Sequence, residues 1–252
     1  MTGILDEYPG AAAAYSLRLL NTDYTGDAVV VRRASDNATQ SIGFIDGELD
    51  TDTLNTFCSG TDGFVTTWLD QSGNGNNATQ TVASTQPKIY DATTGVVLDN
   101  GKPSIYFDDN GNSFVSSNLA GKARLDTYFV IDTNDNTYLY PNDTLNANNY
   151  GYVAEQGSNG AAVLPEYGSP SLYANSQLFT GTTRNDVYNF LNGSKLVVHQ
   201  NANTSNWSGY GFGRYSFYNF NGYLSEFIAY NSDQSGNRTG IETNINDFYS
   251  IY

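Results

Sequence analysis

The residue types that carry out nucleophilic or metal chemistry are scarce in this sequence. It contains one cysteine, Cys58, and one histidine, His199. A single cysteine excludes an internal disulfide and a cysteine-based zinc site, and any Ser–His pair or histidine-ligated metal would have to use the one imidazole. No basic residue close to Cys58 in the sequence would lower the pKa of its thiol, so we expect a small buried hydrophobic side chain there. We therefore expect no catalytic residue of these kinds, no metal and no cofactor.

Sugar recognition is a second kind of chemistry that the residue types allow. Aromatic residues alternate with small ones in WSGYGFGRY (207–215) and follow one another in FYNF (217–220). Aromatic rings pack against the apolar face of a pyranose, and small neighbours keep such rings accessible. The candidate carbohydrate-binding residues here are Trp207, Tyr210, Tyr215 and Tyr218. The alternative is that these rings alternate in and out of a strand pair and fill the core.

The loop DQSGNGN (70–76) is a further candidate site, through Asp70 and Asn74. The alternative, which we favour, is a structural turn in which the glycines supply positive φ and the two polar side chains bond to backbone amides. The oxygen-rich turns DDNGN (108–112) and DTNDN (132–136) resemble calcium-binding loops. Neither continues to the glutamate that closes an EF-hand, which favours solvated turns.

The overall composition excludes several classes of partner. Eleven Lys and Arg residues stand against 26 Asp and Glu residues in 252, giving a net charge of −15 and a pI near 4.1. Such a balance argues against nucleic acid and anionic lipid as partners. No apolar run approaches the ~20 residues of a membrane span, and the first residues lack the basic and apolar regions of a secretory signal. An aromatic content of 14% argues against disorder.

Hydrophobic periodicity predicts an all-β protein with a few short helices. We expect helices over residues 11–20 and 50–57, and a C-terminal helix that Asp233 or Ser235 caps and that buries Ile241, Ile245 and Phe248. Strands are expected over the following segments: 28–33, 64–69, 88–90, 104–107, 128–131, 152–155, 171–174, 187–191, 195–200, 209–212 and 222–230. Asn192-Gly193 predicts a hairpin between two of these strands.

No low-complexity linker or internal repeat divides the chain. Many short strands with frequent turns predict one β-sandwich domain over residues 1–252 rather than βαβ units. Both alternating faces of residues 222–230 carry apolar side chains, as in a strand inside a sandwich. Residues 1–10 are a candidate anchoring arm.

Three segments resemble the catalytic domain of fungal α-L-arabinofuranosidase B. They are YSLRLLNTDYTGDAVVVRRASDNAT (15–39), LNTFCSGTDGFVTTWLDQSGNGNNATQ (54–80) and, more loosely, NGYLSEFIAYNSD (221–233). The resemblance implies a concanavalin A-like jelly-roll sandwich. It covers the first third of the chain well, the last tenth moderately and the centre by architecture only.

The chain ends also resemble laminin-G-like and lectin-like domains of tailed-bacteriophage virion proteins and of some bacterial surface proteins. The segments are YPGAAAAYSLRLL (8–20) and FNGYLSEFIAYNSDQSGNRTGIETNINDFYSIY (220–252). The domains of that group have the arabinofuranosidase-like core but not the catalytic activity.

The family's catalytic carboxylates have no counterpart where the resemblance places them. A retaining glycosidase needs a nucleophile and an acid/base about 5–5.5 Å apart. The family nucleophile is a Glu before a Leu-Phe-Ser-Gly turn; LFTG (178–181) is the similar turn here, and Asn175 occupies the position. The family acid/base falls near Tyr215, and residues 207–222 contain no carboxylate. Glu155 and Glu166 lie in the third of the chain where the family has its nucleophile, but we expect both to be surface residues.

These observations lead to the expectation of a non-catalytic structural protein of a tailed phage. It would sit on the exterior of the virion as a head-decoration or tail-fibre module, as an oligomer made in the host cytoplasm. Its partners would be other capsid or tail subunits and possible cell-surface glycans. One alternative is a glycoside hydrolase of arabinofuranosidase type with displaced carboxylates, and another is a bacterial surface adhesin.

Overall fold

The strands of this protein form a large antiparallel sheet that curves into a sandwich. The computed structural model describes residues 2–108, 110–133, 141–143, 168, 170–215 and 218–252. Within these residues, 16 strands join one network, and helices are few and short. The prediction of an all-β sandwich with a C-terminal helix is confirmed.

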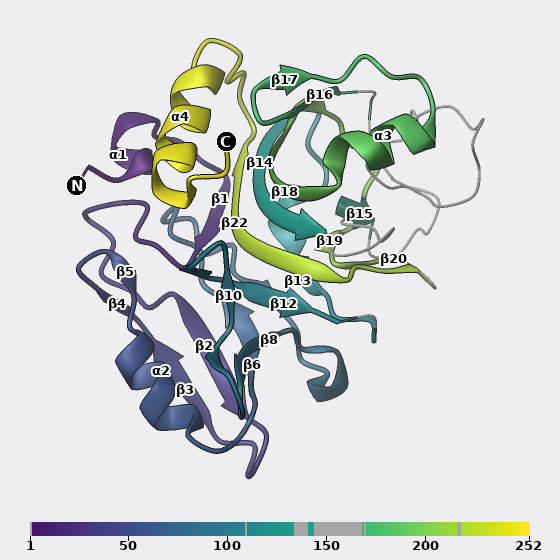
Figure 1. Ribbon diagram of the computed structural model, residues 1–252. Coiled ribbons are helices and arrows are strands. Elements are labelled where there is room, and N and C mark those ends of the chain that lie inside the picture. The colour runs from purple at the N-terminus through teal and green to yellow at the C-terminus, as the bar shows by residue number, and fades with distance from the viewer. Residues whose placement is uncertain (1, 109, 134–140, 144–167, 169, 216–217) are drawn as a thin grey trace.

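Three long strands form the middle of one layer (Figure 1). β22 (Gly222–Tyr230) pairs with β14 (Leu125–Thr133), which pairs in turn with β18 (Gly193–Ala202). The short strand β1 (Ala13–Ser16) also pairs with β22, as does β12 (Ile105–Phe107). β12 connects this layer to the second one, because it is hydrogen-bonded to a strand of each.

The second layer begins where β12 pairs with β8 (Lys88–Asp91). From β8 the path continues through β6 (Gly63–Trp68), β7 (Ala78–Thr79), β13 (Phe114–Ser116), β19 (Tyr210–Phe212) and β15 (Pro141–Asp143). The strands at the margins are β2 (Val29–Arg33), β3 (Thr39–Ile42), β9 (Gly95–Val96), β16 (Ser171–Ala174) and β17 (Gln177–Leu178). In the described part of the chain, three hairpins lie apart from this network: β4 (Phe44–Ile45) with β5 (Glu48–Leu49), β10 (Leu98–Asp99) with β11 (Lys102–Pro103), and β20 (Arg214–Tyr215) with β21 (Tyr218–Asn219).

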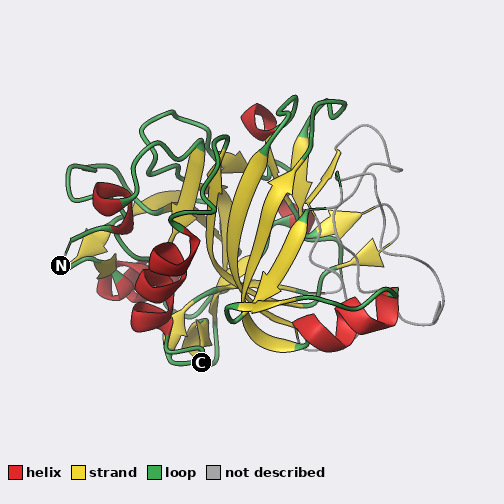
Figure 2. Ribbon diagram, turned by 90° about the horizontal axis from the view of Figure 1, so that it is seen from above, coloured by secondary structure: helices red, strands yellow, loops and turns green. Residues whose placement is uncertain are grey.

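The described residues form four α-helices, which lie at the sides of the strands (Figure 2). They are α1 (Ile4–Glu7), α2 (Thr51–Cys58), α3 (Arg184–Leu191) and α4 (Arg238–Tyr249), and two 3₁₀ turns, Ala83–Thr85 and Ser117–Leu119, lie in connections. Asp50 caps α2 by accepting a hydrogen bond from the Thr53 N–H. α4 begins after Asn237 rather than after the expected Asp233 or Ser235. None of the helices described is long and apolar enough to cross a membrane.

Two apolar cores lie on opposite faces of the central strands. Phe129 of β14 and Phe227 of β22 face the core between the layers. Tyr128 and Ile228, their immediate neighbours, face a second core that α1 and α4 cover. The expectation that both faces of residues 222–230 are buried is confirmed. A register shift in the pairing of β22 with β14 lets Leu224 join Phe227 in the first core despite their odd spacing.

The segment predicted as the first helix is a strand. Residues 13–16 form β1, in register with 226–229 of β22. Ala13 faces the first core and Ala14 the second. Alternate burial and pairing with a central strand override the helix propensity of the alanines, which is less than 1 kcal/mol per residue.

The predicted strand at 187–191 and its hairpin with 195–200 are wrong. Residues 184–191 form α3, and Gly193 is the first residue of β18. Thr183 and Asp186 form a capping box, each side chain bonding to the other's backbone N–H. This local signal, a Thr followed three residues later by an acid, is visible in the sequence. The strand predicted at 152–155 lies outside the described residues.

The segment predicted as an anchoring arm packs onto its own domain. Ile4 and Leu5 of α1 are buried in the second core. The Leu5 N–H donates to the Leu20 carbonyl, 2.8 Å away. Both termini lie beside α4 in Figure 1.

Candidate functional site

The loop between β6 and β7 is organised by one buried carboxylate. The Asp70 side chain accepts hydrogen bonds from the N–H groups of Ala14, Ser72 and Asn76, at 2.8 to 2.9 Å, and from the Ser72 hydroxyl at 2.7 Å. Both carboxylate oxygens of Asp70 are therefore occupied inside the protein. The favoured interpretation of Asp70, a structural turn residue, agrees with these contacts.

Asn74 lies at the tip of this loop and lines a pocket of about 640 Å³. We call this pocket the amide groove; it is lined by Gly10, Ala11, Ala12, Ser72, Asn74, Asn76, Asn118, Ala120, Lys122 and Asn231. The lining comes from four separate parts of the chain, and the sequence analysis identified only Asn74 among its polar residues. No local sequence signal connects the others, because they meet only through strand pairing.

Hydrogen bonds to backbone carbonyls hold two of the groove's amides in place. The Asn74 Nδ2 donates to the Ala11 carbonyl at 2.9 Å, and the Asn76 Nδ2 donates to the Ala12 carbonyl at 2.6 Å. The Asn118 Nδ2 donates in turn to the Asn76 Oδ1. The polar lining is thus a connected set of amides with fixed orientation.

Two of the predicted sugar-stacking aromatics are core residues. Trp207 and Tyr210 are 5% and 0% exposed, and their ring centroids lie 5.6 Å apart. Tyr210 also packs against Phe227 of β22 at 6.0 Å. Protein side chains therefore cover these rings, as the core-filling alternative expected, and the rings offer no open face to a sugar.

Tyr215 and Tyr218 are paired across a short hairpin. Tyr215 ends β20 and Tyr218 begins β21, and the two are direct cross-strand partners.

The turn that carries Asn175 uses its side chain for structure. Asn175 follows β16 in a left-handed conformation, with φ of 49°. Its Oδ1 accepts a hydrogen bond from the Leu196 N–H at 2.9 Å. An amide in this position is not a nucleophile for an anomeric carbon, and Glu155 and Glu166 lie outside the described residues.

His199 is a neutral core residue. It is 3% exposed, on β18 opposite Thr127, with its ring 5.6 Å from that of Phe129. Burial lowers the pKa of His199 to about 3. The imidazole is therefore uncharged at neutral pH and lies away from the surface.

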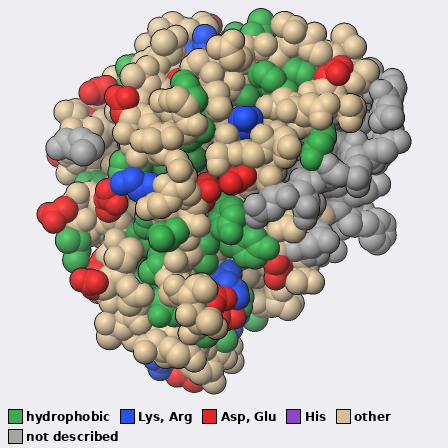
Figure 3. Space-filling model, in the orientation of Figure 1, with side chains coloured by type: hydrophobic (Ala, Val, Ile, Leu, Met, Phe, Trp, Pro, Cys, Tyr) green, Lys and Arg blue, Asp and Glu red, His purple; other side chains and the backbone are tan. Residues whose placement is uncertain are grey.

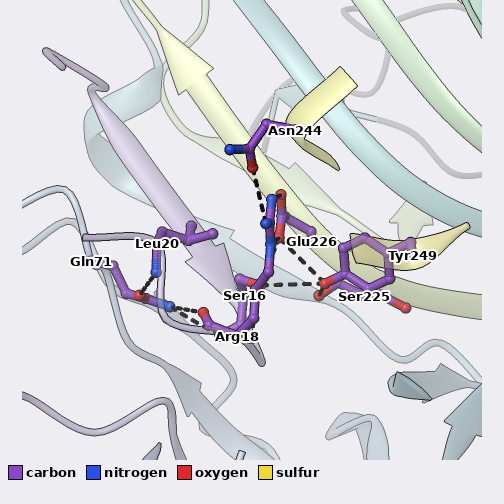
Figure 4. Close-up of polar contacts among 8 residues, drawn as sticks. All are labelled: Ser16, Arg18, Leu20, Gln71, Ser225, Glu226, Asn244 and Tyr249. Carbon is purple, nitrogen blue, oxygen red and sulfur yellow. Dashed lines mark hydrogen bonds and ion pairs between the residues drawn. The ribbon is translucent and has the colours of Figure 1, made fainter. Parts of the chain in front are cut away.

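A buried ion pair lies between β1, β22 and α4 (Figure 4). The Arg18 Nε and Nη2 donate to the two carboxylate oxygens of Glu226, at 2.8 and 3.0 Å, and Nη1 donates to Asn244. Ser16 donates to the same carboxylate, and the hydroxyl of Tyr249 lies 3.3 Å from it. Burial opposes the charge on Arg18, but the charge of Glu226 outweighs it and raises the pKa of Arg18. With its oxygens fully engaged, Glu226 is a structural residue.

Two further buried carboxylates are paired with arginines. Asp126 is bonded by Arg124, with a closest contact of 3.0 Å, and Glu242 by Arg238 at 2.7 Å. Each arginine fixes a negative charge that is shielded from solvent. Neither carboxylate is in position to act on a ligand from solution.

Asp99 and Asp132 form a different kind of acidic pair. Asp99 lies in the β10–β11 hairpin and Asp132 in β14, and their side chains share a hydrogen bond. Burial, followed by the charge of Asp132, raises the pKa of Asp99 to about 6. Asp99 therefore holds a proton at a pH where ordinary aspartates have lost theirs. The two residues are 33 positions apart in the sequence, and no local pattern connects them.

No group of three or more His, Cys, Asp or Glu side chains suited to a metal ion occurs in the described part of the chain. In the turn at 108–112, the Asn112 Oδ1 accepts from the Asp108 N–H at 2.6 Å, which is turn chemistry rather than an open set of cation ligands. Most of the turn at 132–136 lies outside the described residues.

One face of the molecule is mostly uncharged. Figure 3 shows acidic and basic side chains scattered among uncharged atoms over one face of the molecule. The free cysteine contributes nothing to this surface, since Cys58 is buried and burial raises the pKa of its thiol to about 11. The prediction that Cys58 is a small buried side chain is confirmed.

The first part of the chain matches a family of sugar-cleaving enzymes. Residues 6–106 match the model of the catalytic domain of alpha-L-arabinofuranosidase B. No curated protein sequence matches the chain. The matched residues include all of β1, β2 and β6 and the loop that Asp70 organises.

Solved structures of arabinofuranosidases share the fold. One is an arabinofuranosidase complexed with arabinofuranosyl-α-1,2-xylobiose, at 17% identity and a TM-score of 0.53. Another is a GH54 α-L-arabinofuranosidase soaked with a cyclic sulfate inhibitor, at 17% identity and a TM-score of 0.55. Each similarity covers 96% of this chain and 64% of the other, so this chain is shorter than the enzymes it resembles.

These similarities correct the functional expectation drawn from the sequence. The matched model describes a catalytic domain, and the similar structures are those of arabinofuranosidases. The expectation of a non-catalytic virion protein of a tailed phage is therefore contradicted, and so is the expectation that the chain is not an enzyme.

Proposed function

We propose that this chain is a glycoside hydrolase that releases arabinofuranosyl groups from a carbohydrate, using carboxylates other than those at the family positions. The observation that carries the proposal is the match of residues 6–106 to an arabinofuranosidase catalytic domain. The shared fold over 96% of the chain supports it. One of the similar structures holds an arabinofuranosylated xylobiose, so a side-chain arabinose on xylan is the substrate we propose.

Hydrolysis of a glycoside requires one carboxyl group that holds a proton and a second that is ionised. Four buried carboxylates of this protein are unsuited to either role. Asp70 is filled by hydrogen bonds from its own loop, and Asp126, Glu226 and Glu242 are neutralised by arginines. The reacting acids must come from other positions.

Asp99 has the property required of the general acid. With a pKa of about 6, about half of the Asp99 carboxyl groups are protonated at pH 6 and about a tenth at pH 7. Its hydrogen bond to Asp132 brings the two carboxyl groups too close to admit a sugar between them, since a retaining pair stands about 5–5.5 Å apart. The pair therefore supplies the acid, and the ionised carboxylate comes from a third residue.

Glu155 and Glu166 are the candidates for that third residue. Both lie outside the described residues and are proposed from their place in the sequence, in the third of the chain where the family places its nucleophile. A single Glu→Gln substitution in each tests the role with little change of side-chain size.

The test is release of 4-nitrophenol from 4-nitrophenyl α-L-arabinofuranoside, and of arabinose from arabinoxylan. We expect activity in the wild type, and a loss of about 10²-fold or more in Asp99→Asn and in one of Glu155→Gln and Glu166→Gln. Glu7→Gln is the matched control, because Glu7 is an exposed residue of α1. No release above the blank by wild-type protein would overturn the proposal, and equal rates in all variants would overturn the assignment of the acids.

A further inference from the structure

We propose that the amide groove binds a neutral oligosaccharide, as a binding site separate from Asp99 and Asp132. The proposal rests on the proposed function for the source of the carbohydrate, and on the groove itself for the site. Its polar lining is four asparagines, one serine and one lysine, beside three alanines and a glycine.

The charge of the lining selects an uncharged ligand. Among the described residues no carboxylate lines the groove, although the protein carries a net charge of −15. The described lining has no anionic group to bind a cation, and Lys122 is its single positive charge for a multiply charged anion. Amides and hydroxyls form hydrogen bonds in both directions with sugar hydroxyl groups, which donate and accept alike.

The groove is organised before a ligand arrives. The Asn74 and Asn76 amides are fixed by the carbonyls of Ala11 and Ala12, and Asn118 is fixed by Asn76. The segment that carries Asn74 and Asn76 is itself held by Asp70. Side chains that are already ordered lose little entropy on binding, so weak polar contacts yield a larger net affinity.

Polar atoms remain for a ligand. Within the part of the chain that the structure describes, the Oδ1 atoms of Asn74 and Asn118 accept no hydrogen bond, and the Lys122 Nζ forms no ion pair. These groups come from the 70–77 loop, the 3₁₀ turn at 117–119 and the segment just after it. Asn231, the residue that follows β22, completes the polar lining.

The shape of the groove fits a carbohydrate chain. Its volume of about 640 Å³ lies within the usual ligand-pocket range of about 300–1,000 Å³. Ala11, Ala12 and Ala120 give it small apolar surfaces, against which the C–H groups of a sugar ring can lie. Neither Asp99 nor Asp132 lines it, so a sugar bound there contacts neither of these acids.

The experiment measures binding of xylohexaose, an uncharged and unbranched probe, by isothermal titration calorimetry with the full chain. We compare the wild type with Asn118→Ala/Asn231→Ala, because both side chains are exposed and their removal leaves the core intact. The matched control is Asn55→Ala on α2, which contributes nothing to the groove. Each lost neutral hydrogen bond weakens binding about 2- to 13-fold, so the double variant should bind roughly 5- to 160-fold more weakly.

Two results would overturn the proposal. One is equal affinity for xylohexaose in the wild type, the double variant and the control, at equal melting temperatures. The other is no detectable binding by wild-type protein at millimolar xylohexaose. An increase of KM for arabinoxylan in the double variant, without an increase in the control, would support it further.

Hydrolysis of 4-nitrophenyl arabinofuranoside by wild-type protein separates this proposal from the proposed function. If the small substrate is not cleaved but xylohexaose binds in the groove, the hydrolase assignment fails and the groove proposal stands. If the small substrate is cleaved and groove substitutions leave xylohexaose binding unchanged, the groove proposal alone fails.

Discussion

Replacing Asp99 with asparagine should stabilise the protein at neutral pH and not at acidic pH. In the folded protein, burial and the charge of Asp132 raise the pKa of Asp99 to about 6, against 3.8 for an ordinary aspartate. Between these two values the folded state binds more protons than the unfolded state. Stability therefore falls as pH rises from about 3.8 to 6, and the whole penalty is present above pH 6. An asparagine keeps a hydrogen bond to Asp132 and carries no charge.

The gap between the two pKa values sets the size of the effect. At about 1.36 kcal/mol per pKa unit it corresponds to about 3 kcal/mol. Asp99 is partly exposed, and solvent screening reduces this to about 1–2 kcal/mol. For a chain of this length, that gain raises the melting temperature by roughly 2–8 °C at pH 7.5. At pH 4 the gain should vanish.

Thermal melts of the wild type and Asp99→Asn across pH 4 to 8 measure this difference. Asp36→Asn is a control that should change stability in the opposite direction, because the hydrogen bond from Arg33 lowers the pKa of Asp36 to about 2. The stabilising charge of Asp36 is present above pH 3.8 and is lost as pH falls through about 2, so this variant should be less stable at pH 7.5. Equal melting temperatures for wild type and Asp99→Asn at every pH would refute the coupling of Asp99 to Asp132.

Three further predictions follow from buried groups. Arg18→Ala or Glu226→Gln should lower the free energy of unfolding by about 3–5 kcal/mol in urea titrations, because the remaining partner stays buried and unpaired. A change below about 1 kcal/mol would contradict the structural role of the ion pair. The Cys58 thiol, with its pKa raised to about 11, should react with Ellman's reagent at pH 8 only after unfolding, and prompt labelling of native protein would show that it is accessible. The NMR signals of His199 should not shift between pH 5 and 8, whereas a titration midpoint near 6.5 would show an exposed imidazole. Because the pKa of His199 in the folded protein is about 3, the free energy of unfolding should fall as pH drops below about 6.5 and should level off near pH 3.

Local sequence signals predicted the elements whose stability is mainly local. α2 and α4 were recognised from helical spacing of apolar residues, with caps displaced by a few residues. Residues 222–230 were recognised as a strand with two buried faces, which the two cores confirm. Where local preference and tertiary contacts disagreed, the contacts prevailed: β1 is a strand because β22 pairs with it between two cores.

The site was less predictable than the fold, because its parts are far apart in the chain. Asp70 and Asn74 were found because they share one loop, and Trp207 and Tyr210 were candidates because a sequence does not show which aromatic faces are covered. The Asp99–Asp132 contact depends on the placement of a hairpin beside β14, and no sequence pattern encodes it.

The sequence by itself determined the class of fold, the positions of the longer strands and the similarity of residues 6–106 to an arabinofuranosidase domain. The tertiary structure decided which acids are neutralised by arginines, which one holds a proton, and which amides line a common groove. The reason is physical: strand and helix preferences act over a few residues, whereas burial, charge pairing and groove shape depend on residues that only folding brings into contact.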